Sequence, residues 1–513
     1  MVRRIKPRTT SDRSSLLLPP AGGAVVRMYR IGHGDCFLLS FAGEDPNKPV
    51  YVLIDCGYKP GSPGKLKRPT EVKEIGFDII AATGGFVDIA IITHEHQDHV
   101  NGFTKSNFPG LKVGEVWFGW TEDPEDELAK TLRVKFRDRM LKLIDKSIEL
   151  RGLGLDAAAD RVSEMLEFEL GEDPSLYRGA MLAATGKDPA QSANKRAMRY
   201  LQDCCEQQPV YLSPHGKPRP VKGAQSARAF VLGPPRDIES IDELNPYAEE
   251  SFGEDDHAQA ISAGKGIGRS QNKLLFPQKH MIPLQGAFSH PEFGDFFRTY
   301  YGADTPDTEQ PADGDDAPTN ASWRRIGRLA GNDATSLSLA MNNATNNSSL
   351  VIAFELSKGG KVLLFAADAQ AGNWRTWSRD SFKDDGKTVT VKELLQRVVL
   401  YKVGHHGSHN ATLNGEVNSR HANLSWMAKE AYGNEFVAMI TAVEAWAHQR
   451  PKPDWNHPFP AIKHALEERA AGRVIQTDAD LDERPSGSKP ADWQEFRQRL
   501  TITPLYFDLR IDS

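Results

Sequence analysis

The sequence predicts an α/β protein in which two strand-rich regions flank a long helical and irregular stretch. Residues 24–57 contain three short apolar runs separated by Gly and Asp turns, which is typical of a meander of strands. A helical pattern over residues 71–86 leads into a buried strand at residues 87–92. Strand patterns return between residues 349 and 403, so we expect one layered domain interrupted by a large insert.

The remaining elements follow in order along the chain. Charged helical patterns occupy residues 122–153, 155–170 and 190–206, whereas residues 240–345 are polar and are predicted to be irregular. Within that stretch, the acidic, Pro-rich residues 304–319 are expected to be a disordered loop. Later strands and helices are predicted at residues 349–355, 361–366, 391–397, 398–403, 436–441, 460–470 and 474–477. The predicted domain limits are a flexible basic tail at 1–23, a first half at 24–118, an insertion at 119–345 with a core strand at 228–235, and a second half at 346–513.

The composition excludes several classes of protein. A net charge of −6 argues against general polyanion binding, so contact with nucleic acid requires a local basic patch. No stretch approaches the ~20 consecutive apolar residues of a membrane helix, so we expect no membrane contact. Four cysteines are too few for a disulfide scaffold in a chain of 513 residues, which favours a reducing, cytoplasmic location.

The most informative motif is residues 93–99, Thr-His-Glu-His-Gln-Asp-His, directly after the predicted strand at 87–92. His94 and His96 alternate to one side and can share one divalent ion, while Asp98 and His99 can reach a second ion. A solvated loop is the competing interpretation, but four potential ligands directly after a predicted buried strand favour a metal site. The mixture of N and O donors makes zinc the expected metal and manganese the alternative.

Two further strand ends carry candidate residues. Asp368 follows the predicted strand at 361–366, where its carboxylate can bridge two cations or, alternatively, cap a helix. His405 and His406 lie between two glycines after the strand at 398–403, so one imidazole can bind metal while the other acts as a general acid or contacts phosphate. His457 is a weaker candidate, and a loop histidine without a role is the competing interpretation.

Two sets of charged residues complete the candidates. Asp35 and Asp55 lie in Gly-Asp and Asp-Cys-Gly turns. We expect their carboxylates to support the loop that carries the metal ligands without binding the metal themselves. No acidic residue lies between Gln207 and Arg236, and this segment contains the candidate phosphate-binding residues Lys217, Arg219 and Lys222. A solvated loop is the competing interpretation of that segment.

Taken together, these motifs resemble the metallo-β-lactamase-fold hydrolases and, among them, the soluble hydrolase domain of the ComEC-type DNA-uptake proteins. The matching segments are residues 32–35, 53–57, 93–102, 231–235, 347–351, 364–368, 402–408 and 456–458. The resemblance covers about 24–118, 228–235 and 346–480. It implies a four-layer αββα sandwich, with a dinuclear site at one edge of two sheets and a large insertion. The membrane channel of the uptake proteins has no counterpart, so transport is not implied.

The resemblance also implies roles for the candidate residues. By position, His94 and His96 would bind one metal, Asp98 and His99 the other, and Asp368 would bridge them. His406 would complete the second site, with His457 as the competing ligand, and His405 would face the substrate. The supporting residues would be Asp35, Asp55 and Ser408. An additional histidine ligand of many relatives has no clear equivalent, since the available histidines are weakly placed: His215, His257, His280 and His290.

The expected function is a metal-dependent phosphodiesterase or nuclease that acts on a nucleic acid or nucleotide. In this mechanism a hydroxide activated by two divalent ions attacks phosphorus, and Asp98 and His405 are the catalytic side chains. One alternative is hydrolysis of a carboxylic ester, thioester or lactone, because the fold alone does not fix the bond that is cleaved. The other is a non-catalytic module with a vestigial site, in which the insertion binds a protein partner.

Overall fold

The computed structural model describes residues 16–45, 47–183, 191–243, 246–252, 289–301, 326–449, 455–486 and 488–513. The chain forms two compact units. The first comprises Met1–Met140, Leu166–Asp255 and Ala340–Ser513, and the second comprises Leu141–Met165 and Asp256–Leu339. The predicted loop at 304–319, together with His257 and His280, lies outside the described residues.

The first unit contains two large mixed sheets. The strands of the first are, in spatial order, β16 (Leu500–Ile502), β17 (Tyr506–Ile511), β1 (Ala24–Tyr29), β2 (Cys36–Phe41), β3 (Val50–Cys56), β4 (Phe86–Ile91), β5 (Lys112–Gly119) and β6 (Val210–Leu212). The strands of the second are β15 (Val474–Gln476), β14 (Val437–Ile440), β13 (Val398–Lys402), β10 (Val362–Phe365), β9 (Val351–Glu355), β8 (Arg228–Gly233) and β7 (Arg219–Pro220). A separate hairpin joins β11 (Ser381–Asp384) to β12 (Lys387–Thr390).

Each sheet has a parallel and an antiparallel part. In the first sheet β3, β4, β5 and β6 are parallel, and the remaining pairs are antiparallel. In the second sheet β10, β13, β14 and β15 are parallel. The structure is therefore a mixed α/β protein, which confirms the predicted class.

Strand alternation separates the side chains of each sheet into two apolar clusters. Phe37, on β2, belongs to a cluster that also contains Phe354 and Phe365 from the second sheet. Leu38, the next residue of β2, belongs to a different cluster that includes Ile79 of helix α1. Because both faces are covered, the strands are apolar at nearly every position rather than at alternate ones.

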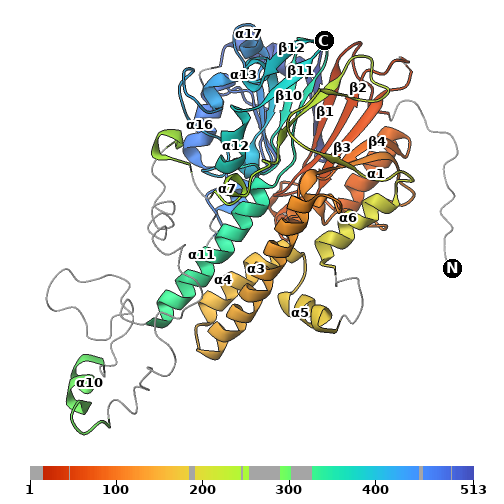
Figure 1. The fold of residues 1–513 in the computed structure, drawn as a ribbon. Coiled ribbons are helices and arrows are strands. Elements are labelled where there is room, and N and C mark those ends of the chain that lie inside the picture. Colours follow the sequence, from red (N-terminus) through yellow and green to blue (C-terminus); the bar gives the residue numbers. More distant parts are fainter. Residues whose placement is uncertain are drawn as a thin grey trace. The chain divides into compact units, whose positions relative to one another are not determined.

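The helices of the first unit cover the outer faces of the two sheets (Figure 1). Helices α1 (Val72–Thr83) and α6 (Ala193–Asp203) contribute to the apolar cluster behind the first sheet. Helices α12 (Ala371–Trp377), α13 (Val391–Gln396) and α16 (Pro460–Arg469) contribute to the cluster behind the second. The first unit also contains α2 (Gln97–Val100), α7 (Ile238–Ile241), α14 (Tyr432–Glu435), α15 (Glu444–Ala447) and α17 (Pro490–Gln498).

The predicted insertion at 119–345 is only partly separate from the sheets. It contains α3 (Glu127–Gly152), α4 (Asp156–Leu170), α5 (Pro174–Ala183), α6, α10 (Gly294–Tyr301) and most of α11 (Ile326–Asn347). The prediction that residues 240–345 are irregular is wrong for α10 and α11. Besides the expected core strand β8, the insertion also supplies β6 to the first sheet and β7 to the second.

The N-terminal residues that the structure describes pack onto the first sheet. Leu17 is buried, its amide donates to the carbonyl of Ala82 at 2.9 Å, and its own carbonyl accepts from the hydroxyl of Ser40 at 2.7 Å. Residues 1–15 of the predicted tail lie outside the described residues. Among the described helices, none combines the length and the hydrophobicity needed to cross a membrane.

Candidate metal centre

The histidine motif runs from the loop after β4 into helix α2, and several polar contacts hold it in place. The amide and the hydroxyl of Thr93 donate to the two carboxylate oxygens of Asp55, at 2.9 and 2.6 Å. The carbonyl of Thr93 accepts from the amide of Leu350, which connects the loop to the second sheet. Gly57 packs so closely on Asp98 and His99 that a side chain there would collide with their backbone. The loop is thus fixed from both sheets.

One group of possible ligands consists of His94, His96 and Asp368, all of them buried. The Nε2 atom of His94 lies 3.0 Å from the Nδ1 atom of His96, so the two imidazoles converge on one point. One ligand atom from each of the three residues lies within 4.8 Å of the others. This spacing suits a single cation with N and O donors.

A second group consists of Asp98, His99, His406 and the same Asp368. The Nε2 atom of His406 lies 3.0 Å from Oδ2 of Asp98 and 3.5 Å from Oδ2 of Asp368. The Nε2 atom of His99 lies 3.2 Å from Oδ1 of Asp368. Asp368 therefore belongs to both groups, as a bridging carboxylate would.

Hydrogen bonds orient both imidazoles of the second group. The Nδ1 atom of His99 lies 2.8 Å from the carboxylate of Asp55, and Nδ1 of His406 lies 3.1 Å from the carbonyl of Thr441. If Nδ1–H donates in each case, the lone pair of Nε2 points toward Asp368. Carboxylate and carbonyl acceptors of this kind commonly select the ligand tautomer of a metal-binding histidine.

The electrostatics of this cluster favour a bound cation. The cluster contains five buried carboxylates and only two buried lysines. The carboxylates belong to Asp35, Asp55, Asp98, Glu169 and Asp368, and the lysines are Lys59 and Lys402. Oδ1 of Asp98 and Oδ2 of Asp368 are buried without a hydrogen-bond partner among the described residues. Such atoms are costly unless they are paired or bind a metal. These buried His and Asp groups can therefore hold a metal ion.

The carboxylates that would bind the metal are held in their charged form. Burial works to raise the pKa of Asp98, but Lys59, His406 and His99 hold it well below its usual range. Burial also works to raise the pKa of Asp368, but His99, His406 and Lys402 hold it well below its usual range. Both groups are thus anionic at neutral pH and suited to a divalent cation.

The two buried lysines contact the same carboxylates. Lys402 pairs with Asp35 at 2.5 Å and lies 3.5 Å from Asp368. Lys59 lies 3.6 Å from Oδ2 of Asp98 and packs over the ring of Phe168. Burial lowers the pKa of Lys59 to about 8, although Asp98 opposes that shift.

His405 and His406 adopt left-handed backbone conformations, with φ of 38° and 53°. Strain of this kind persists where the surrounding structure enforces it, often at functional sites. Gly404 lets the turn approach Ala411 closely, because a Cβ atom at that position would lie 2.7 Å from the carbonyl oxygen of Ala411. The turn directs His406 into the ligand group and leaves His405 beside it, with 16% of its side chain exposed.

His405 contacts polar side chains rather than a carboxylate at bonding distance. Its Nδ1 atom lies 2.9 Å from the amide nitrogen of Gln370, and its Nε2 atom lies 4.0 Å from Oδ2 of Asp368. Burial lowers the pKa of His405 to about 3, so the imidazole is neutral at pH 7. The amide nitrogen of Asn346 lies 3.4 Å from Nε2, so amide side chains flank both ring nitrogens.

His457 lies beside the cluster and outside every possible ligand group of the described residues, including a third one made of Asp35, Asp55 and His99. Its ring stacks on that of His33, with centroids 5.5 Å apart, and its centroid lies 6.4 Å from that of His406. His33 is fully buried and packs against His406 at 4.5 Å. The geometry therefore favours His406 over His457 as the last ligand.

The insertion contributes side chains to the motif loop that the sequence analysis did not identify. Glu169, at the end of α4, places Oε1 2.9 Å from Nε2 of His96. Lys195, on α6, pairs with Glu95 of the motif and with Glu122 at 2.8 Å. A single Glu or Lys in a charged helical pattern has no local feature that distinguishes it from a solvated residue.

The other predicted residues lie away from the ligand groups. Within the described chain no contact joins Lys217, Arg219 or Lys222 to the metal cluster, and Arg219 instead lies 3.4 Å from Glu115. Lys217 and Lys222 are exposed. The hydroxyl of Ser408 donates to Asn410 at 3.1 Å.

Two of the histidines considered as the additional ligand, His215 and His290, belong to the described residues, and both lie away from the metal cluster. His215 is half-exposed and pairs with Asp380 at 3.2 Å. His290 is exposed and bonds to the backbone of Glu292 and Phe293. Neither belongs to a ligand group of the described residues.

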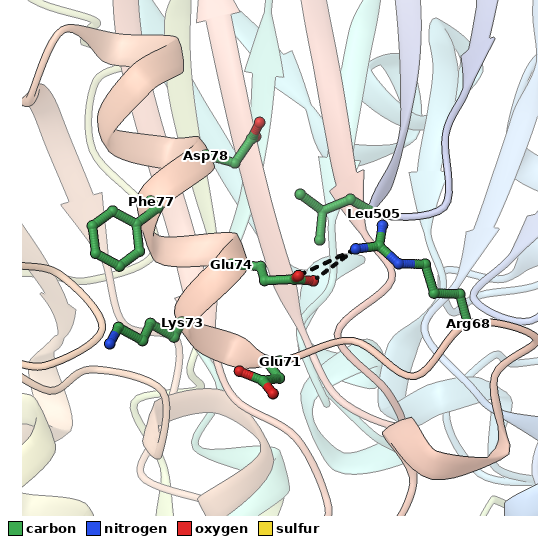
Figure 2. A pocket seen from close by; sticks show the side chains of 7 residues that line it. All are labelled: Arg68, Glu71, Lys73, Glu74, Phe77, Asp78 and Leu505. Atoms are coloured by element: carbon green, nitrogen blue, oxygen red, sulfur yellow. Dashed lines mark hydrogen bonds and ion pairs between the residues drawn. The ribbon is translucent and has the colours of Figure 1, made fainter. Parts of the chain in front are cut away.

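A surface hollow beside α1 is chemically unrelated to the metal cluster. Figure 2 shows that it is lined by Arg68, Glu71, Lys73, Glu74, Phe77, Asp78 and Leu505. Arg68 pairs with Glu74 at 3.1 Å, so part of its charge is already compensated. None of its residues belongs to a possible ligand group.

No protein-family model matches this chain, and no curated protein or solved structure matches it either.

Proposed function

We propose that this protein is a metal-dependent hydrolase of the metallo-β-lactamase fold, and that it cleaves phosphodiesters with two divalent ions. The observation that carries the proposal is the position of Asp368 in both ligand groups. Two metals that share a carboxylate are typical of sites that hold the attacking and leaving oxygens of a hydrolysis. Zinc is the expected metal because His and Asp are the donors, and manganese is the alternative.

The arrangement of the sheets supports the proposed fold. An apolar cluster separates the two mixed sheets, and helices contribute to the clusters behind each of them, as in a four-layer αββα sandwich. The candidate ligands follow β4, β10 and β13, which are all in the parallel parts of the sheets. Side chains at the carboxyl ends of such strands commonly form the active site of an α/β protein.

The residues around the ligands support phosphodiester hydrolysis. When bound, the two ions would supply a nucleophile from water at neutral pH and offset charge on the phosphoryl oxygens. His94 and His96 would bind one ion, Asp98, His99 and His406 would bind the other, and Asp368 would contact both. These residues hold the reacting groups in one orientation, which lowers the entropic part of the barrier.

Two further side chains suit an anionic substrate. His405 is neutral, and its ring N–H can donate a hydrogen bond to an oxygen of the substrate. Lys59 carries a buried ammonium beside Asp98, which can pair with a phosphoryl oxygen. A nucleic acid or nucleotide is the expected substrate, and the exposed Lys217 and Lys222 can contact a polyanion beyond the reacting phosphate.

The test combines metal analysis with two model substrates. We expect close to two divalent ions per chain and faster cleavage of bis-p-nitrophenyl phosphate than of p-nitrophenyl acetate. His406→Ala should lose the activity, whereas the matched control His464→Ala, which removes an exposed imidazole from α16, should retain it.

Three outcomes would contradict the proposal. Absence of metal after reconstitution would exclude a metal-dependent hydrolase, and activity on the acetate alone would identify an esterase instead. Normal metal content without activity on either substrate, or on single- and double-stranded DNA and RNA, would favour a non-catalytic module.

A further inference from the structure

Glu169 is a buried carboxylate that contacts a candidate metal ligand without belonging to a ligand group. It lies in the last turn of α4, within the predicted insertion and outside every segment of the family resemblance. It is 2% exposed, so its negative charge has been removed from water. A buried carboxylate is costly unless hydrogen bonds or cations compensate it.

The contacts of Glu169 fix its position. Oε1 lies 2.9 Å from Nε2 of His96 and accepts from the side-chain amide of Asn342 at 3.3 Å. Oε2 accepts from the hydroxyl of Thr345 at 3.0 Å. Asn342 and Thr345 both belong to α11, so one inserted segment presents the carboxylate and another holds it.

His96 stands between Glu169 and the metal position. Its Nε2 atom faces Glu169, and its Nδ1 atom faces Nε2 of His94 at 3.0 Å. A neutral imidazole carries one proton, so a ring that donates from Nε2 presents a lone pair at Nδ1. Because Glu169 lies on the opposite ring nitrogen from His94, it can orient the ligand without binding the metal itself.

We propose that Glu169 is a positioning residue that selects the metal-binding tautomer of His96, so that the insertion sets the metal affinity of the His94–His96–Asp368 site. This inference rests on the proposed metal centre. Asp55 and the Thr441 carbonyl have the equivalent contacts with His99 and His406, but they come from the segments of the resemblance. Glu169 thus has the equivalent role for His96, and its position depends on the inserted helices.

The inserted helix α6 contacts the same loop independently. Lys195 is held between Glu95, which lies between His94 and His96 in the sequence, and Glu122. Burial works to lower the pKa of Lys195, but the two glutamates raise it, so the ammonium is charged at neutral pH. Two inserted helices therefore hold the segment that carries the ligands of this site.

The test measures zinc affinity of the full chain in the absence of substrate, by competition with a chromogenic chelator. Glu169→Ala should weaken one of the two binding steps by about 10–100-fold and leave the other within a few-fold of the wild type. Glu169→Gln should keep most of the affinity, because its amide oxygen can still accept from Nε2–H. Glu167→Ala, which removes an exposed carboxylate from the same turn, is the matched control and should bind zinc as the wild type does.

The variants separate this inference from competing explanations. Wild-type zinc affinity in Glu169→Ala would overturn it, even if the metal centre is real. Equal losses in Glu169→Gln and Glu169→Ala would also overturn it, because the charge rather than the tautomer would then matter. Loss of both binding steps together with a lower melting temperature of the metal-free protein would assign Glu169 to folding. A wild-type chain that binds no zinc or manganese would instead refute the proposed function.

Discussion

Removal of divalent cations should lower the thermal stability of the protein by a predictable amount. The candidate ligands come from three separated segments, at residues 94–99, 368 and 406, so the unfolded chain cannot assemble them. An ion that binds only the folded state stabilises it by mass action. In the metal-free protein, Oδ1 of Asp98 and Oδ2 of Asp368 also lack a hydrogen-bond partner among the described residues.

The magnitude follows from the occupancy of the sites and the size of the first unit. At a free metal concentration of a hundred times Kd, each site contributes ~2.7 kcal/mol. An unfolding entropy of ~2.1 cal/mol/K per residue over about 400 residues of the first unit converts two sites into a shift of about 6 °C, and one site into about 3 °C.

The assay is thermal unfolding followed by intrinsic fluorescence, first with EDTA and then with zinc or manganese restored above Kd. The melting temperature should recover in steps that match the metal content, and Asp368→Asn should show a much smaller recovery. A melting temperature that is unaffected by chelation and by both metals would refute the view that these buried groups form a metal site.

Three other changes test the site, the substrate and the core. Asp368→Ala should abolish hydrolysis and release at least one metal while far-UV circular dichroism stays unchanged, since its carboxylate contacts both ligand groups; wild-type turnover and metal content would contradict this. Replacing Lys217, Arg219 and Lys222 with Ala should weaken binding of long polynucleotides and flatten its salt dependence, with little effect on a small phosphodiester. Equal losses on both substrates would mean that the segment shapes the active site, and no loss on either would make it a solvated loop. Phe37→Ala should lower the free energy of unfolding by about 3–5 kcal/mol, because the ring is fully buried between the sheets against Phe365; a loss below about 1 kcal/mol in urea titration would contradict the packing.

The elements that could be predicted from the sequence are those with a strong local pattern. The apolar runs before the histidine motif, Asp368 and His405 are strands in the structure, and their ends carry the candidate ligands. Helix α11 could not be predicted in this way, because its last turns contain Asn342, Asn343, Asn346 and Asn347, and asparagine is a poor helix former. Tertiary contacts compensate there, since the side chain of Asn347 donates to backbone carbonyls of α7 and of Glu243.

The candidate site shows the same division between local and distant information. The residue types of the ligands and their places at strand ends are visible in a short window of sequence, so the ligands could be proposed. The orienting groups could not, because Glu169 and Thr441 reach His96 and His406 only through the packing of distant segments. Lys59 was missed for a similar reason, since a lysine in a turn is normally solvated and this one is buried against Asp98.

The pairing of β1 has a consequence for synthesis of the protein. This strand lies between β2, which follows it closely, and β17, which ends at Ile511. While the chain emerges from the ribosome, one edge of β1 has no partner until almost 500 further residues have been made. An unpaired strand edge is a template for aggregation, and contacts of such high sequence separation form slowly. Nascent chains stalled before β17 should therefore bind chaperones that protect exposed strand edges.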